Sequence, residues 1–197
     1  MSTILLGIDP GLTRCGFGLI EAMPGRKLRH IEHGVIETSA TMPLGERLAF
    51  IAVEFEKLID RAQPSSIGIE RVFAQQNLHS VMGVAQVSGV VLMIAARRGI
   101  PISMHTPTEV KLSVTGTGRA IKSQVAKMVS KLLLLTEVPK PADAADALAI
   151  AIACAWRSPA LNANEEQQST EYGSSSRTNA QEKWQSAIEA SKRKSKA

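Results

Sequence analysis

The chain has 197 residues, of which 44% are hydrophobic and 21% charged, with a net charge of +5 at pH 7. This length is enough for one globular domain with a sizeable core. No segment approaches the roughly 18 uninterrupted apolar residues of a membrane-spanning helix, and the first residues lack the pattern of a secretory signal. We therefore expect a cytoplasmic protein that does not enter a membrane. The mild excess of base permits an acidic partner such as nucleic acid without requiring one.

The amino-terminal part of the chain predicts three strands in a meander. They are expected at 3–8, 14–21 and 28–38. Pro-Gly pairs at 10–11 and 24–25 separate them, and such pairs are typical of turns. Strands joined by turns this short are expected to pair antiparallel.

A helix is expected next, within 43–64. Apolar residues such as Leu48, Ile51 and Phe55 recur there at helical spacing. The polar residues expected on the opposite, solvent-facing side are Glu46, Arg47, Glu54 and Lys57. The pattern therefore indicates an amphipathic helix that lies on the sheet.

The remainder of the chain alternates strands and helices. In chain order we expect a strand at 65–72, a helix at 79–98, a strand at 100–105, and helices at 122–135 and 141–156. An antiparallel meander followed by alternating helices and strands predicts an α/β fold, with a mixed five-stranded sheet and helices on both faces.

The composition changes after this region. The residues from Ser158 onward are rich in Ser, Asn, Gln and charge and contain few branched apolar side chains. Such a segment cannot bury enough apolar surface to fold by itself. We therefore expect a folded domain over 1–157 and a disordered polar tail over 158–197.

Carboxylates stand where two of the expected strands end. Asp9 follows the apolar run "ILLGI", and Glu70 ends "SIGIE". If the two strands are neighbours in the sheet, these acids emerge side by side. Asp143 and Asp146 are spaced i, i+3, which places them on one face of the last helix. Asp143 could equally be an acid that only stabilises the helix amino terminus, whereas Asp146 precedes a run that is apolar nearly all round.

Four acids at close range cannot all ionise without a cation between them. Hard oxygen ligands favour Mg²⁺ or Mn²⁺. Two such ions roughly 3.5–4 Å apart are the common arrangement for in-line displacement at a phosphodiester. The acids therefore predict a metal-dependent phosphodiesterase with Mg²⁺ as cofactor, two ions per site, and Mn²⁺ as a substitute.

Four segments in register resemble the RuvC family of Holliday junction resolvases. They are "GIDPG", "IERVF", "KSQV" and "ADAADALAIA", and the resemblance runs over 3–157. It implies a ribonuclease H-like fold, with Asp9, Glu70, Asp143 and Asp146 as catalytic acids and metal ligands. It also implies a homodimer that cuts four-way DNA junctions in paired incisions, leaving 5′-phosphate and 3′-hydroxyl ends, in DNA recombination and repair. RuvA and RuvB, the branch-migration proteins, are the implied partners.

The same resemblance suggests residues that contact DNA. Phe73 follows Glu70 into a polar loop, where it could stack on an unpaired base or fold back onto the core. The resemblance also suggests Lys111 and Lys122 as basic residues at the DNA. Arg119 is a candidate on different grounds, because it lies with Lys122 in "TGTGRAIKS", whose two glycines suit close approach to a phosphate. All three could equally belong to an ordinary solvated surface.

The apolar helix at 79–98 carries small residues that would let a second backbone approach. Gly83, Ser88 and Gly89 are the candidates for a dimer interface. The alternative is a helix that lies entirely inside the domain, with no partner chain against it.

Two other functions remain to be weighed. "DPGLT" fits the first phosphate loop of sugar kinases and actin-like ATPases, but those proteins need two such domains and a second glycine-rich loop. A nucleic-acid-binding module without catalytic activity is the second alternative, and four intact acids argue against it.

Overall fold

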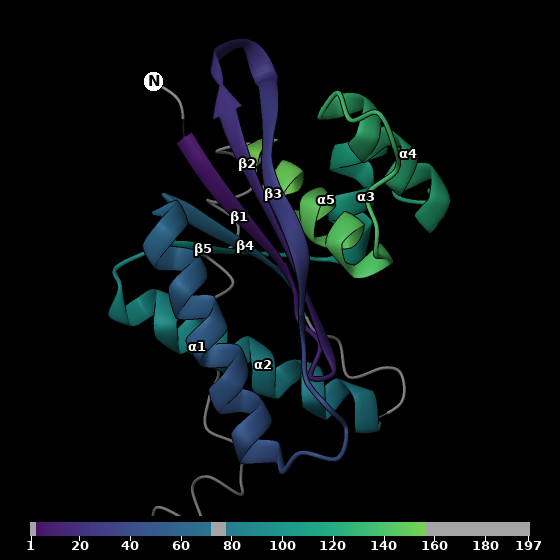
Figure 1. The fold of residues 1–197 in the computed structure, drawn as a ribbon. Coiled ribbons are helices and arrows are strands. Elements are labelled where there is room, and N and C mark those ends of the chain that lie inside the picture. Colours follow the sequence, from purple (N-terminus) through teal and green to yellow (C-terminus); the bar gives the residue numbers. More distant parts are fainter. Residues whose placement is uncertain (1–2, 72–77, 157–197) are drawn as a thin grey trace, which may run out of the picture. The chain divides into compact units, whose positions relative to one another are not determined.

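The structure, a computed structural model, describes residues 3–71 and 78–156. Its sheet contains five strands: β1 (Thr3–Asp9), β2 (Arg14–Met23), β3 (Lys27–Glu37), β4 (Ser66–Glu70) and β5 (Ile102–His105). The strand order is β3-β2-β1-β4-β5 (Figure 1). The β1–β2 and β2–β3 pairs are antiparallel, and the β1–β4 and β4–β5 pairs are parallel. The predicted mixed sheet is confirmed, and β1 is its central strand.

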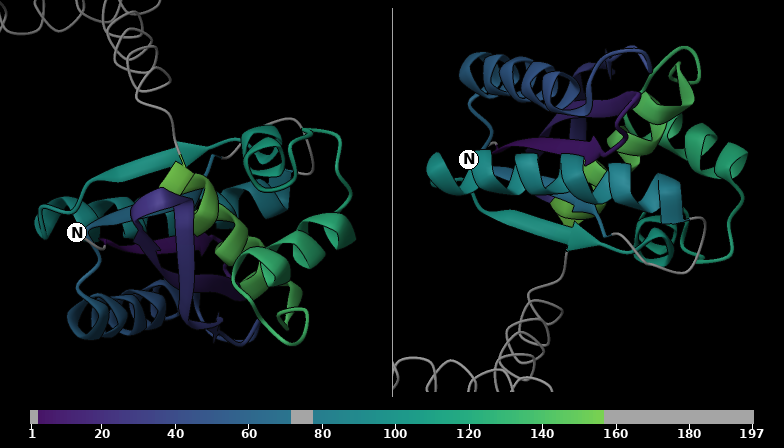
Figure 2. Two further views of the ribbon diagram at one scale, coloured as in Figure 1. Left: turned by 90° about the horizontal axis from the view of Figure 1, so that it is seen from above. Right: turned by 90° about the horizontal axis from the view of Figure 1, so that it is seen from below.

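Helices cover both faces of the sheet. They are α1 (Leu44–Ala62), α2 (Leu78–Arg97), α3 (Pro107–Thr115), α4 (Lys122–Leu132) and α5 (Ala142–Trp156), and a 3-10 turn, η1 (Pro24–Arg26), joins β2 to β3. One core lies between the sheet and the α1–α2 pair, and a second lies between the sheet and α5, with α3 and α4 packed beside α5 (Figure 1 and Figure 2). Within the residues that the structure describes, no helix is long and apolar enough to cross a membrane.

The contact between α5 and the sheet depends on glycines in the strands. A Cβ atom added at Gly7 of β1 would lie 2.1 Å from the Ala147 carbonyl oxygen, and one at Gly16 of β2 would lie 2.2 Å from the Asp143 carbonyl oxygen. Backbone atoms of a helix cannot move aside as a flexible side chain can. Gly7 and Gly16 therefore set how closely the acid-bearing helix approaches β1 and β2.

The structure corrects three details of the sequence-based expectations. Helix α3 was not predicted, although Thr106 and Glu109 form a capping box at its start and this spacing is a helix signal. Helix α4 ends at Leu132 rather than at residue 135, and Leu134 has a φ of 54° that does not continue a helix. Arg47, expected on the solvent-facing side of α1, is only 9% exposed.

Candidate active site

The register of β1 and β4 places the first two acids. The strands pair in parallel, with Leu5 opposite Ser66 and Ile8 opposite Ile69. Asp9 and Glu70 are the next residues along the two strands, so both lie at the same edge of the sheet. The expectation that these strands are neighbours, which the sequence alone left conditional, is confirmed.

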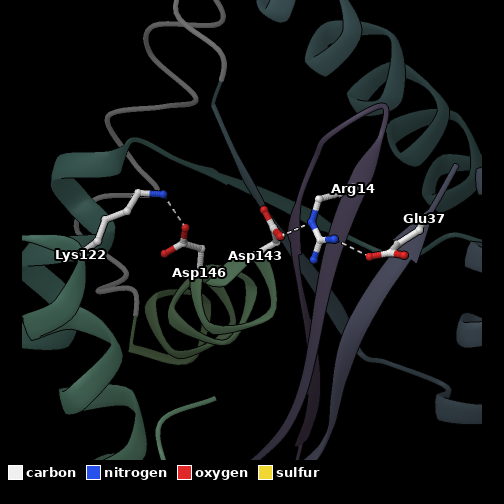
Figure 3. Close-up of polar contacts among 5 residues, drawn as sticks. All are labelled: Arg14, Glu37, Lys122, Asp143 and Asp146. Carbon is white, nitrogen blue, oxygen red and sulfur yellow. Dashed lines mark hydrogen bonds and ion pairs between the residues drawn. The ribbon is translucent and has the colours of Figure 1, made fainter. Parts of the chain in front are cut away.

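Helix α5 begins at this edge and brings the other two acids. Asp143 lies in its first turn, beside Gly16 of β2, and Asp146 lies one turn further on. The side chain of Asp146 is 26% exposed and that of Asp143 is 33% exposed. The two carboxylates point to opposite sides, one toward α4 and the other toward β2 (Figure 3).

Two cations hold the acids of α5. The Nζ atom of Lys122, the first residue of α4, donates to Oδ2 of Asp146 at 2.7 Å. The Nε atom of Arg14, the first residue of β2, donates to Oδ2 of Asp143 at 2.8 Å. The guanidinium of Arg14 also donates through Nη1 to Glu37, which ends β3. Figure 3 shows these contacts as two separate ion-paired groups.

The electrostatics of the site are those of crowded, desolvated carboxylates. Burial raises the pKa of Asp9 to about 7, and the negative charges of Glu70, Asp146 and Asp143 add to the shift while Lys122 opposes it. Burial, together with Asp146, also raises the pKa of Glu70. A hydrogen bond with Asp9 partly offsets this rise. Without an added cation, the cluster therefore keeps a proton near neutral pH.

A hollow of about 80 Å³ opens beside the acids. Its lining residues are Glu70, Pro107, Val110, Lys111, Lys122, Val125, Asp146, Ala149 and Ile150. Lys111 and Lys122 therefore lie next to the carboxylates of Glu70 and Asp146 at this hollow. Arg119 is exposed in the α3–α4 connection and does not line this hollow.

The four acids fit a divalent cation by their chemistry. Their donors are all carboxylate oxygens, the ligands that Mg²⁺ and Mn²⁺ prefer. The ammonium group of Lys122 already lies against Asp146, which shows that the cluster accepts a positive charge. Among the described residues, no three acidic, histidine or cysteine side chains converge as a ready-made metal site. In this structure Asp143 and Asp146 are instead paired with Arg14 and Lys122.

The residues expected to contact DNA or a second protomer lie in different surroundings, some exposed and some buried. Phe73 lies outside the described residues. Gly83 faces Leu12 of its own chain, 3.2 Å from an added Cβ, and Ser88 is 5% exposed with its hydroxyl donating to the Val84 carbonyl. Ser88 is therefore buried within its own chain, which does not fit an interface residue, whereas Gly83 is half-buried against Leu12. Gly89 lies on the exposed side of α2, with no atom within 4 Å of an added Cβ.

The ribonuclease H-like sheet, with a cluster of acids where β1 and β4 end and α5 begins, is the arrangement of a hydrolytic nuclease. The model of the family described as crossover junction endodeoxyribonuclease RuvC matches residues 5–154. The chain belongs to this family, whose members resolve Holliday junctions in DNA recombination and repair.

Individual relatives and structures agree with this assignment. The crossover junction endodeoxyribonuclease RuvC of Streptomyces griseus is 55% identical over 158 residues, which cover 80% of this chain and 78% of the relative. That of Paenarthrobacter aurescens is 47% identical over 194 residues, covering 98% and 100%. The structure of Thermus thermophilus RuvC in complex with a Holliday junction substrate matches with a TM-score of 0.73 and 34% identity, over 77% of this chain and 92% of that one.

Proposed function

We propose that this chain resolves four-way DNA junctions by Mg²⁺-dependent hydrolysis of phosphodiesters at the acid cluster, leaving 5′-phosphate and 3′-hydroxyl ends. The observation that carries the proposal is the meeting of Asp9, Glu70, Asp143 and Asp146 at one end of β1, β4 and α5. The family match and the junction bound by the Thermus thermophilus relative support the choice of substrate.

Each acid has a distinct part in this mechanism. Asp9 and Glu70 are fixed by strands and would form the rigid part of a site for two Mg²⁺ ions, whereas Asp143 and Asp146 would turn to complete it. Bound Mg²⁺ would neutralise the phosphate and favour attack by water. Lys122 would leave Asp146 and donate to a phosphate oxygen, since its side chain is largely exposed and flexible.

The test compares a synthetic four-way junction with a plain duplex of the same sequence, each with and without Mg²⁺. We expect binding of the junction in both conditions and paired, symmetric cuts only with Mg²⁺. The cut products should be joined by DNA ligase without further treatment, because their ends are a 5′-phosphate and a 3′-hydroxyl. Junction binding that never becomes scission would favour the alternative of a binding module without activity.

A homodimer is also part of the proposal, because a two-fold dimer places two active sites against a two-fold symmetric junction. The exposed side of α2 supports it. Met82, Leu92 and Met93 are large apolar side chains on this side, and Gly89 lies among them. Exposed apolar surface of this kind is typical of protein–protein contacts.

Gly89→Leu should make the protein monomeric. The added side chain meets no atom of its own chain, so the fold should persist, whereas close contact between two α2 helices would be blocked. Sedimentation and circular dichroism measure the two effects, and paired incision should fall more than single nicking. Gly45→Leu on α1, where an added Cβ also meets nothing, is the matched control. A Gly89→Leu variant that stays dimeric would place the interface elsewhere.

Lys111→Ala and Lys122→Ala should weaken junction binding and reduce its salt dependence. Each phosphate contact contributes roughly −0.9 to the slope of log affinity against log salt concentration. Binding titrations at several salt concentrations measure the slope. Lys57→Ala, which removes a lysine paired with Glu54 on α1, is the control that should leave it unchanged. Unchanged slopes in both test variants would show that Lys111 and Lys122 do not contact phosphates and are ordinary solvated side chains.

The remaining parts of the proposal concern cellular context. We place the protein in the cytoplasm, acting with the branch-migration proteins RuvA and RuvB, on the strength of its family. Co-sedimentation on a four-way junction with purified RuvA and RuvB tests this partnership.

A further inference from the structure

Arg14 links a proposed metal ligand to an acid outside the site. Its Nε atom donates to Asp143, and its Nη1 atom donates to Glu37. We call these three residues the Arg14 bridge. Both ion pairs are partly exposed, so each is expected to be weak and reversible.

A buried arginine holds together the two backbone segments that carry Arg14 and Glu37. Arg47 of α1 donates from Nε to the Thr38 hydroxyl at 2.9 Å and from Nη2 to the Thr13 hydroxyl at 2.7 Å. The backbone N–H of Thr38 donates to the Thr13 carbonyl at 3.0 Å. Thr13 and Thr38 are the chain neighbours of Arg14 and Glu37. The start of β2 and the end of β3 are therefore held together, and Arg14 and Glu37 stay within reach of each other.

The bridge directs Asp143 away from the other acids. Figure 3 shows its carboxylate turned to Arg14, on the side opposite to Asp146 and Lys122. The absence of a three-ligand cluster among the described residues agrees with this orientation. A cation bound among the acids would have to compete with the guanidinium for the carboxylate of Asp143.

We propose that Arg14 is a positioning residue that competes with the metal for Asp143, and that Glu37 favours metal binding by holding Arg14 when Asp143 leaves it. This inference rests on the proposed function, because it takes Asp143 as a metal ligand. It assigns opposite effects to two residues that contact each other. Loss of Arg14 frees Asp143, whereas loss of the Glu37 charge leaves Arg14 with Asp143 as its only anionic partner in the bridge.

The test determines Mn²⁺ affinity from the concentration of free Mn²⁺, measured by electron paramagnetic resonance at fixed pH and ionic strength. Arg14→Gln should bind Mn²⁺ more tightly, and Glu37→Gln more weakly, each by about 1.5- to 5-fold, the range that an exposed ion pair supports. In the double variant the Glu37→Gln effect should vanish, because Glu37 acts through Arg14.

Matched controls come from a second Arg–Glu pair. Arg61 of α1 donates to Glu32 of β3 at 2.7 Å, and neither residue touches the acids. Arg61→Gln and Glu32→Gln should leave Mn²⁺ affinity unchanged. If Glu37→Gln keeps its full effect in the Arg14→Gln background, the two charges act independently through space, and the competition is refuted. Shifts of Arg14→Gln and Glu37→Gln in the same direction, or none in either, refute it as well.

A structural measurement keeps the test independent of variant folding. In crystals of the wild-type protein with Mn²⁺, Asp143 should contact the metal and be free of Arg14, while Arg14 keeps Glu37. Mn²⁺ bound by Asp143 with the Arg14 contact intact would overturn the inference. A wild type that binds no Mn²⁺ at the acids would overturn it together with the proposed function. If the Arg14 and Glu37 variants do not show the expected changes in Mn²⁺ affinity but the wild type binds Mn²⁺ at the acids, the inference fails and the proposed nuclease function is unaffected.

Discussion

Asp9→Asn is expected to abolish junction cleavage and, at the same time, to make the protein more stable without metal. The pKa of Asp9 is about 7 in the folded protein, against an ordinary 3.8. At pH values between 3.8 and 7, Asp9 is protonated in the folded state and ionised in the unfolded chain. The contribution of this group to the free energy of unfolding is therefore full below pH 4 and falls as the pH rises to 7. Above pH 7 the free energy of unfolding is lower by at most about 4 kcal/mol because of this group.

An uncharged Asn at position 9 removes this penalty. Thermal unfolding at pH 7.5 should show a higher melting temperature for Asp9→Asn than for the wild type, and the difference should shrink at pH 5. Mg²⁺ should raise the melting temperature of the wild type much more than that of the variant. Asp143→Asn is the control, since it loses a partly exposed ion pair worth about 0–1 kcal/mol, and its charge contributes least to the raised pKa of Asp9. An Asp9→Asn variant that melts no higher than the wild type would show that burial and the neighbouring acids do not raise the pKa of Asp9.

Gly7→Ala is expected to reduce both stability and cleavage. A methyl group at this position overlaps the backbone of α5 at Ala147 and Ala151, so the helix must move from the sheet. Overpacking of this kind costs typically about 1–3 kcal/mol. Because Asp143 and Asp146 are carried by α5, the same movement displaces two of the four acids. Denaturant unfolding and junction cleavage measure the two losses.

Gly45→Ala is the matched substitution for Gly7→Ala. An added Cβ meets no atom there, and alanine in a helix is favoured over glycine by roughly 0.5–1 kcal/mol. Its stability should stay equal or rise, and its cleavage activity should not change. If Gly7→Ala behaved like Gly45→Ala, the close contact of α5 with β1 would not be what positions the acids.

The acids were predictable from the sequence because each has a local signal. Asp9 and Glu70 end apolar strands, and Asp143 and Asp146 share one helix face. Only the pairing of β1 with β4 was needed to bring Asp9 and Glu70 together, and a mixed sheet made that pairing plausible. The arrangement of strands and helices followed from hydrophobic patterning: α1 has a clear helical periodicity, and α2 is a long, nearly continuous apolar segment.

The groups around the acids had no such signal. Arg14 and Asp143 are 129 positions apart, and no pattern in either segment indicates that they contact each other. Arg47 lies among polar residues of α1, so periodicity alone assigned it to solvent, whereas its hydrogen bonds to Thr13 and Thr38 make burial possible. The direction of Ser88 on α2 was equally undetermined, because that helix is apolar on most sides and either face could have been the buried one.

The central claim is that the four acids bind the metal ions that cleavage requires. Anomalous scattering from crystals grown with Mn²⁺, at a concentration that supports junction cleavage, tests it most directly. We predict Mn²⁺ peaks bounded by Asp9, Glu70, Asp143 and Asp146, with Lys122 withdrawn from Asp146. Peaks at other places only, with Asp143 and Asp146 still paired to Arg14 and Lys122, would contradict the account.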